Sequence, residues 1–437
     1  MLKINGIAFG LGLAVMSLAV SPNPLPNGPP DAASDSLTLE RALKMVARNH
    51  PGLEAGRSAV LAREAALMQG SRGPNPELGI EVEDIAGTGE LRGMKSAQST
   101  LQISQTLEGG DKRGKRKQVA LVEKALAEKE LGRKGLELQA LTHAHFMDAL
   151  AAQKRLAMAH ESQSLAKRLL DAVVRRVREG AASTADEIRA NLAVTEAELE
   201  ARQDTLRLET AKKKLALLWG EDKKPFFALQ DELESLRTLP SAEELTKALE
   251  QGLQVALQAE HVRLAEARLL EQQTLSSPDM TLSAGIRHSA APGDLSWVGG
   301  ISVPLPIRNR NLGGKDAARH RVAEAKAEEK AALLELKSGL AEIHRAISLA
   351  WEEITTLRER LIPDSERAAH VLEEGYRRGR FGVLDVLNSE ADLFRQRVRY
   401  LDALVRYQQG YADLERLIGT NDVSGKASKQ GPQGKED

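Results

Sequence analysis

Two aspartates follow glycine-containing turns at matching places in the chain. Asp186 lies six residues after Gly180, Asp385 lies six residues after Gly379, and the two pairs are 199 residues apart. A carboxylate in the first turn of a helix interacts favourably with the helix dipole, by about 0.3–1 kcal/mol. Glycine often ends a helix because it adopts a positive φ at no steric cost. We therefore expect each pair to mark a tight turn between two helices, with the aspartate capping the second helix.

Metal ligands and catalytic groups are sparse. The chain has no cysteine, nine histidines and eight methionines. His143 and His145 are two residues apart on a predicted helix and do not face each other, and the methionines form no tight cluster suited to copper(I). No nucleophile, base and orienting residue occur at a recognisable spacing. We expect no metal site, no cofactor and no enzymatic activity.

One glycine-rich stretch imitates a phosphate-binding loop. Gly109 to Arg116 matches the spacing of its glycines and lysine, but Arg116 stands where a magnesium-binding Ser or Thr is required. We treat this match as accidental.

The composition favours long, solvated helices. Charged residues make up 28% of the chain and aromatic residues only 3%, a mixture typical of extended helical proteins. The net charge is -1, and basic residues are interspersed with acids along the helices, so we expect no nucleic-acid partner.

The beginning of the chain predicts export. Residues 1–20 carry one lysine and then an uncharged apolar run with a small-x-small pattern, which indicates a cleaved signal peptide. An N-terminal anchor helix is the less favoured alternative, because the run is short for a membrane span of about 20 residues. Proline-rich residues 21–36 predict a flexible lead-in, and residues 420–437 predict a disordered tail. No later run is apolar enough to cross a membrane as a helix.

The rest of the chain reads as two structural repeats. Residues 37–220 predict helices, a β-hairpin at about 77–107, and a long helical hairpin with its tip near residue 180. Thr184 and Glu187 have the spacing of a capping box for the return helix. Residues 221–240 predict an irregular joint.

The second repeat, residues 241–419, follows the same order. It predicts helices, a β-hairpin at about 279–305 whose second strand is Trp297 to Leu305, and a helical hairpin interrupted at Pro363 with its tip near residue 379. Its last helix carries two adjacent apolar rows with alternating steps of three and four, and therefore needs neighbours on two sides. The first row is Leu384, Leu387, Ala391, Phe394, Val398, Leu401 and Val405, and the second is Tyr400, Leu404, Tyr407, Tyr411, Leu414 and Ile418.

Four strands are too few to close a barrel, since closure around a packed interior needs about eight. Open strand edges are not tolerated against lipid. If the strands span a membrane, several chains must therefore share them, and three copies would supply twelve.

This order of elements resembles the TolC family of outer-membrane efflux channels. The resemblance covers nearly all of the chain after the expected signal. It rests on the opening from Leu39 to Leu53, on two strand pairs that each precede a long helix, and on Tyr376 to Leu387 after the second tip. Ser99 to Arg116 is more similar to the heavy-metal, CzcC-like branch, which handles cobalt, zinc, cadmium or nickel. Some relatives in that branch carry an acylated N-terminal cysteine, which this chain lacks.

The resemblance implies a mainly α fold with two β-hairpins: a homotrimer with a 12-stranded transmembrane β-barrel in the outer membrane and an α-helical barrel through the periplasm. It also implies a function, as the outer-membrane channel of a tripartite resistance-nodulation-division efflux system that exports divalent nickel, cobalt, zinc or cadmium. The implied partners are outer-membrane lipid of a Gram-negative bacterium, a periplasmic adaptor (membrane fusion protein) and an inner-membrane resistance-nodulation-division pump.

The resemblance assigns roles at the tips as well. Asp385 matches an acidic position that lines the constricted periplasmic mouth, where three copies would form a carboxylate ring that selects cations. For this residue, gate and helix cap both stay open, whereas the cap is favoured for Asp186. Asn388 stands where the family can carry a second acid. The tips, with Gly180, Asp186, Gly379 and Asp385, would receive the hairpins of the adaptor.

Two other functions stay open. A conduit of the same fold for drugs or secreted proteins is the first. A periplasmic adaptor or scaffolding coiled coil is less favoured, because an adaptor would carry one helical hairpin between short β halves and this chain predicts two hairpins and two strand pairs.

Overall fold

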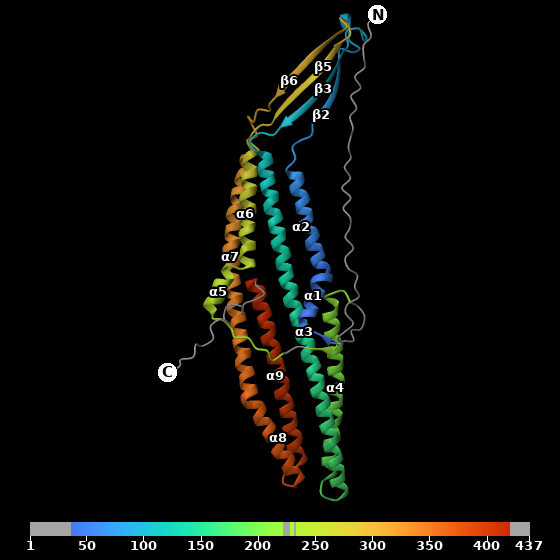
Figure 1. Cartoon of the computed structure of the whole chain (residues 1–437), viewed down its shortest axis with the longest axis vertical. Coiled ribbons are helices and arrows are strands. Elements are labelled where there is room, and N and C mark those ends of the chain that lie inside the picture. The colour runs from blue at the N-terminus through green and yellow to red at the C-terminus, as the bar shows by residue number, and fades with distance from the viewer. Residues whose placement is uncertain (1–35, 222–227, 231–232, 420–437) are drawn as a thin grey trace, which may run out of the picture.

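The computed structural model describes residues 36–221, 228–230 and 233–419, and over this range the chain is long and narrow (Figure 1). A four-stranded sheet lies at one end, long helices form the shaft, and two helical hairpins turn at the other end. The expected signal, most of the lead-in and the expected tail lie outside the described residues. Among the described helices, none combines the length and apolar character that a membrane span requires.

The first repeat begins with two helices separated by His50, and Pro51 is the first residue of the second helix. The His50 Nδ1 accepts a hydrogen bond from the Gly52 N–H at 2.9 Å, and Pro51 suits the first helical position, where an N–H has no partner in any case. The elements of this repeat are α1 (Leu39–Asn49), α2 (Pro51–Gly70), β2 (Glu77–Glu83), η1 (Gly89–Leu91), β3 (Gln98–Leu107), α3 (Lys112–Arg178) and α4 (Thr184–Leu217).

The second repeat has the same order, with one irregularity. A π-helical turn, η2 (Leu357–Leu361), interrupts the long helix just before Pro363, whose ring nitrogen cannot donate to the helical ladder. The other elements are α5 (Ala242–Glu250), α6 (Leu253–Thr274), β5 (Met280–Ser289), β6 (Asp294–Ser302), α7 (Leu312–Thr356), α8 (Ile362–Arg377) and α9 (Val383–Ile418).

Three sequence-based expectations were wrong in detail. The fourth strand is Asp294–Ser302 and not Trp297 to Leu305, because Pro304 cannot donate to a strand ladder. The cap of α4 is Ser183 with Asp186, one residue before the expected pair of Thr184 and Glu187.

The third correction concerns the joint between the repeats. It contains a short strand, β4 (Ala228–Leu229), which pairs in parallel with β1 (Ser36–Leu37) at the end of the expected lead-in. The Gln153 amide of α3 holds β4 by bonding both the N–H and the C=O of Leu229, at 3.0 and 2.9 Å. The β4 part of the joint is therefore anchored on the first repeat, and the joint is not wholly irregular.

The two hairpins form one antiparallel sheet with the order β2-β3-β5-β6. Strand β3 of the first repeat pairs with β5 of the second over ten residue pairs, so the duplicated halves share the sheet. The outer strands β2 and β6 each have one unpaired edge within the described chain.

The main core lies in the middle of the shaft, where α1, α3, α4, α5, α7 and α9 meet. Phe146, Leu215, Ile347 and Leu404 are almost fully buried there. A smaller cluster near the hairpin turns joins Val173 and Ala190 of the first repeat to Tyr376, Val383 and Val386 of the second. The second apolar row of α9 is confirmed as core from Leu404 to Ile418, and Tyr400 packs against that core.

Each long helix after the sheet starts in the same unusual way. Asp111 before α3 and Asn311 before α7 both have positive φ, 60° and 52°, and they are 200 residues apart. A Cβ added to Gly114 or Gly314 would lie 2.2 Å from the Oδ1 of the preceding Asp111 or Asn311. This matched close approach to a glycine three residues into the helix supports the duplication predicted from the sequence.

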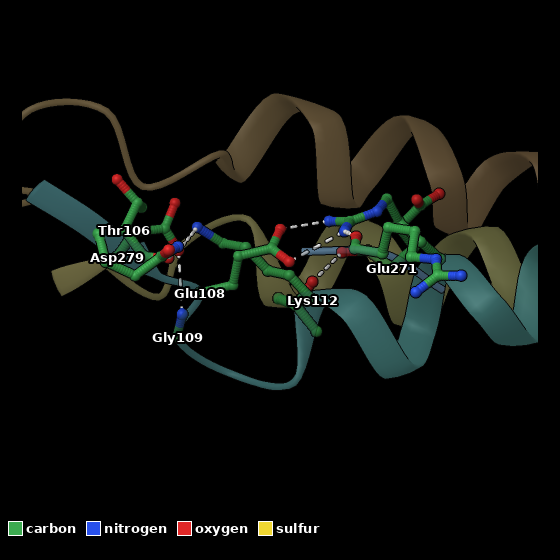
Figure 2. Close-up of polar contacts among 10 residues, drawn as sticks. Thr106, Glu108, Gly109, Lys112, Glu271 and Asp279 are labelled. Atoms are coloured by element: carbon green, nitrogen blue, oxygen red, sulfur yellow. Dashed lines mark hydrogen bonds and ion pairs between the residues drawn. The ribbon is translucent and has the colours of Figure 1, made fainter. Parts of the chain in front are cut away.

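Ion pairs fix the sheet to the helices at the start of α3 (Figure 2). The Lys112 Nζ lies 2.7 Å from the Asp279 Oδ1, which also accepts the Gly109 N–H at 2.9 Å. The Arg116 guanidinium pairs with both oxygens of Glu108 and donates to the Arg72 carbonyl at 3.2 Å. Lys112 and Glu108 are mostly buried, so we expect these pairs to hold the direction of the sheet relative to the shaft.

We predict that replacing Gly109 with Ala destabilises the contact between the sheet and the start of α3. The added Cβ would lie 2.1 Å from the Pro278 carbonyl oxygen, and neither backbone segment can move without breaking the contacts of Asp279. We expect a loss of about 1–3 kcal/mol, as for other overpacked sites. Thermal unfolding in detergent, followed by circular dichroism, would measure it.

Gly135→Ala is the matched control. Gly135 lies inside α3, and no heavy atom lies within 4 Å of an added Cβ. This variant should be more stable by about 1 kcal/mol, because alanine favours a helix over glycine. Equal effects of the two substitutions would contradict the assigned role of Gly109.

Candidate functional site

The two hairpin tips have the same backbone structure. Gly180 has φ 72° and Gly379 has φ 74°, so each glycine ends its helix in the left-handed region. In the first tip the Ala181 N–H bonds to the Arg176 carbonyl at 2.7 Å, and in the second the Arg380 N–H bonds to the Gly375 carbonyl at 2.8 Å. These bonds satisfy helix carbonyls that would otherwise lack partners.

The return helices are capped by the two aspartates. The Asp186 carboxylate accepts the Ser183 hydroxyl at 2.8 Å and the Ser183 N–H at 3.1 Å, and these bonds hold the pKa of Asp186 below its usual value. The Asp385 carboxylate accepts the Gly382 N–H at 2.9 Å. Both aspartates are therefore caps, and Asp385 is exposed while Asp186 is half-buried.

A groove runs beside Asp385 on the wall of the shaft. The lower part of the first apolar row of α9, from Leu384 to Val398, faces residues of α3 and α4 across it. Asn388 also lines this groove, as do Arg189 and Glu196 of α4. The N-terminal part of α9 thus lies beside α4 and α3 without filling the space between them.

One arginine links the two tips. The Arg176 Nη1 of α3 donates to the Tyr376 carbonyl of α8 at 2.7 Å, and its guanidinium lies 4.7 Å from the centre of the Tyr376 ring. Tyr376 is buried, which raises the pKa of its hydroxyl. Because guanidinium and ring stack across the repeats, the first and second hairpins are held side by side at their turns.

The sheet has one polar and one apolar face, and the apolar face is the more exposed. Opposed residues in the register share a face, so Ile80, Leu101, Ile286 and Trp297 lie on the same side. Ile80 is 75% exposed and Trp297 84%, whereas Thr100 on the other side is 2% exposed. This is the reverse of a sheet in a water-soluble domain, which buries its apolar face.

The polar face is organised around Arg287 of β5. Its guanidinium donates to the Thr100 hydroxyl at 3.0 Å and to the Gln98 side chain at 3.2 Å on β3, and lies 3.1 Å from the Glu83 carboxylate on β2. Glu77 and Glu81 lie on the same face of β2 as Glu83. The polar face therefore carries more acidic than basic groups along its β2 edge.

No group of three or more metal-ligating side chains is present among the described residues. His145 lies beside Asp148, and burial lowers the pKa of His145 and raises that of Asp148. The Asp148 carboxylate accepts a bond from Gln409 of α9 at 2.8 Å. Asp148 thus joins α3 to α9, and the pair of His145 and Asp148 offers two ligands at most.

The structure also explains the imitation of a phosphate-binding loop. Lys112 and Arg116 are engaged with Asp279 and Glu108, and Arg116 lies within the first turns of α3. Lys112 and Arg116 are therefore committed to the contact between sheet and shaft.

Sequence reasoning missed the roles of Arg176, Tyr376 and Arg287. A lone arginine in an alternating strand signals an inward-facing polar network, and this signal could have found Arg287. The pair of Arg176 and Tyr376 depends on how two hairpins lie side by side, which spacing within one helix does not reveal.

Comparisons with known proteins agree with this architecture. The family model described as "Outer membrane efflux protein" matches residues 42–221 and 245–420, one match for each repeat. The chain is 31% identical over 390 residues to the cobalt-zinc-cadmium resistance protein CzcC of Cupriavidus metallidurans, covering 89% of this chain and 92% of that protein. It is 23% identical to the nickel-cobalt-cadmium resistance protein NccC of Alcaligenes xylosoxydans xylosoxydans, covering 72% and 70%.

Solved structures show the same fold. The outer membrane protein VceC of Vibrio cholerae superposes with a TM-score of 0.72 at 17% identity, covering 87% of this chain and 96% of that chain. The family match includes both hairpin tips and the whole sheet. The chain therefore belongs to the outer membrane efflux protein family, and its place is the outer membrane, with a part that extends into the periplasm.

Proposed function

We propose that three copies of this chain form a closed channel that exports divalent heavy-metal cations, with nickel, cobalt, zinc and cadmium as the cargo class. The observation that carries this proposal is the inverted sheet at the end of helices far too long for a compact domain. Its apolar face is exposed, whereas its polar face is buried or half-buried along the central strands β3 and β5. Such a sheet is suited to lipid outside and water inside.

The two free edges support closure by several copies, and the need for a lumen favours three. Strands β2 and β6 have no partner on one side within the described chain, and unpaired backbone groups are costly in lipid. Pairing β2 of one copy with β6 of the next gives a ring of twelve strands from three copies. A ring from two copies would have eight strands and little or no lumen.

The helical part offers a matching surface for a second copy. Four apolar side chains of α4 are more than half exposed and recur at steps of four and seven, which places them on one face: Ile188, Leu192, Leu199 and Leu206. On a helix in water such a row is unusual. We propose that it packs on the next subunit and that twelve helices, four from each copy, enclose a periplasmic tunnel.

The cargo class rests on the relatives and on charge. CzcC and NccC are named for resistance to cobalt, zinc, nickel and cadmium. The β2 edge of the polar face carries Glu77, Glu81 and Glu83, and Asp385 stands exposed at a hairpin tip. Carboxylates that line a pore favour cations over anions. A conduit for drugs or secreted proteins is the alternative, and no feature of the described residues favours it.

The tips are the proposed docking site. They are the part of the chain farthest from the sheet, so in the outer membrane they point toward the inner one. We propose that Gly180, Asp186, Gly379 and Asp385 shape the tips that a periplasmic adaptor contacts, and that a resistance-nodulation-division pump lies behind it. In the assembled trimer, Asp385 would form a ring of three carboxylates at the narrow end, with Asn388 beside it.

We predict that deleting this protein makes cells sensitive to divalent metals. Inhibitory concentrations of cobalt, zinc, cadmium or nickel should fall, because the export route loses its outer-membrane channel, while copper tolerance should not change. Growth of the deletion strain across these five metals would measure this, and the wild-type gene on a plasmid should restore tolerance. Unchanged tolerance to all four predicted metals would refute the proposed cargo.

We predict that Asp385→Ala changes ion flow through the channel. Removing a ring of carboxylates should lower the preference for cations, by a factor on the order of two, and raise the single-channel conductance. Planar bilayer recordings of the purified protein would measure both quantities.

Asp186→Ala is the matched control, because Asp186 caps the equivalent helix of the first repeat. If Asp385 only caps a helix, both variants should behave alike in the bilayer. A change in selectivity confined to Asp385→Ala supports the gate, and wild-type currents in that variant rule the gate out.

A further inference from the structure

The end of the shaft is strongly basic. Five arginines are exposed at the two hairpin turns, and we call them the basic tip surface: Arg175, Arg178, Arg377, Arg378 and Arg380. Glu179 is the acidic residue among residues 175–183 and 376–382, and it is exposed as well. The turns therefore concentrate positive charge at the point most distant from the sheet.

Part of this charge is uncommitted. Arg377 pairs with Glu373 at 3.0 Å and Arg378 with Glu374 at 2.9 Å, both one helical turn back along α8. Arg175, Arg178 and Arg380 make no ion pair with any residue that the structure describes. The nearby Asp186 and Asp385 do not pair with these three arginines, because their carboxylates accept backbone N–H groups of their own turns.

The choice of basic residue is selective. The sequence has no lysine from residue 168 to 211 or from 338 to 425, so the positive charges at both tips and along the adjoining shaft are arginines. The guanidinium presents a planar set of donors that matches a carboxylate in two parallel hydrogen bonds, whereas lysine is a point charge. Lysine and arginine attract an anionic membrane equally well.

Apolar side chains lie among the arginines. Phe381 is 41% exposed beside Arg380, and Leu384 is 44% exposed in the first turn of α9. Arginine and aromatic side chains together are typical of protein interfaces. The composition therefore favours a protein partner over lipid headgroups.

We propose that the basic tip surface binds a partner that presents carboxylates at the end of a helical hairpin. This inference rests on the proposed function, in which the partner is the periplasmic adaptor, and it adds the chemistry of the contact. The adaptor tip carries Glu or Asp side chains that pair with Arg178 and Arg380, one from each hairpin of this chain. The stacked Arg176 and Tyr376 keep these two turns at a fixed spacing.

The binding test uses the purified full-length protein and two synthetic helical hairpins that differ only at the turn, four Glu against four Gln. The Glu hairpin should bind about ten-fold more tightly at low salt, and added salt should remove the difference. The double variant Arg178→Glu with Arg380→Glu should bind both hairpins equally. Equal binding of the two hairpins by the wild-type protein would overturn the proposal.

The matched control reverses two arginines away from the tips. Arg367 of α8 and Arg395 of α9 are exposed and pair with Asp364 and Asp392. Arg367→Glu with Arg395→Glu makes the same change in net charge and should keep the preference for the Glu hairpin. Loss of the preference in this control would show that the net charge of the protein, and not the basic tip surface, determines binding of the Glu hairpin.

Metal tolerance of a complemented deletion strain tests the tip contact separately from the proposed channel function. If wild-type protein restores metal tolerance to a deletion strain and the Arg178→Glu/Arg380→Glu variant does not, a functional tip contact is supported. Tolerance regained when the acids at the adaptor tip are changed to lysine would identify the partner. Full tolerance with the reversed tips would sink the inference and leave the channel intact, whereas wild-type protein that restores nothing would count against the channel itself.

A vesicle-binding experiment tests whether the partner of the basic tip surface is a lipid membrane or a protein. Vesicles of phosphatidylcholine with and without phosphatidylglycerol are mixed with the wild-type and tip-reversed proteins. No difference between the two proteins in binding to anionic vesicles agrees with a protein partner. Binding of anionic vesicles that disappears on tip reversal, together with no preference for the Glu hairpin, would assign the surface to the membrane instead.

Discussion

Backbone N–H and C=O groups without partners at two strand edges are the main constraint on the architecture of this protein. The sheet exposes its apolar face and has free edges on β2 and β6. In water the apolar face would be unfavourable, and in lipid the edges would be unfavourable. The proposed closure of the edges against other copies of the chain would satisfy both demands. The inverted faces, the shared β3 and β5 pairing and the long helices all agree with that requirement.

Long helices carry the chain from the sheet to the two hairpin tips. Two ion pairs set the direction in which α3 leaves the sheet: Lys112 with Asp279, and Arg116 with Glu108. At the far end, glycine turns and the contact between Arg176 and Tyr376 bring two hairpins together. The duplicated chain therefore places a matched pair of tips at a fixed distance from the membrane, where a partner can engage both.

The sequence predicted what depends on local pattern. Alternation located both strand pairs, glycine spacing located both tips, and the apolar rows of α9 identified its C-terminal half as core. It missed the end of β6, where Pro304 outweighed the alternation, and the cap of α4, because two overlapping pairs fitted one capping pattern. The contacts of Arg176 and Arg287 join residues 187 to 204 positions apart in the sequence, and no local pattern encodes such pairs. A gating role for Asp385 requires carboxylates from neighbouring copies, and the pattern of a single chain does not show how copies assemble.

Disulfide trapping between β2 and β6 tests the central claim most directly. The native chain has no cysteine, so introduced pairs report without background. Within one chain β3 and β5 separate these strands by about 14 Å, too far for a disulfide. Pairing Gly79→Cys or Glu81→Cys with cysteines at Ser296, Val298 or Gly300 should give reducible dimers and trimers in the membrane for pairs in register, and no larger species. Monomers alone across the whole panel would contradict closure by three copies.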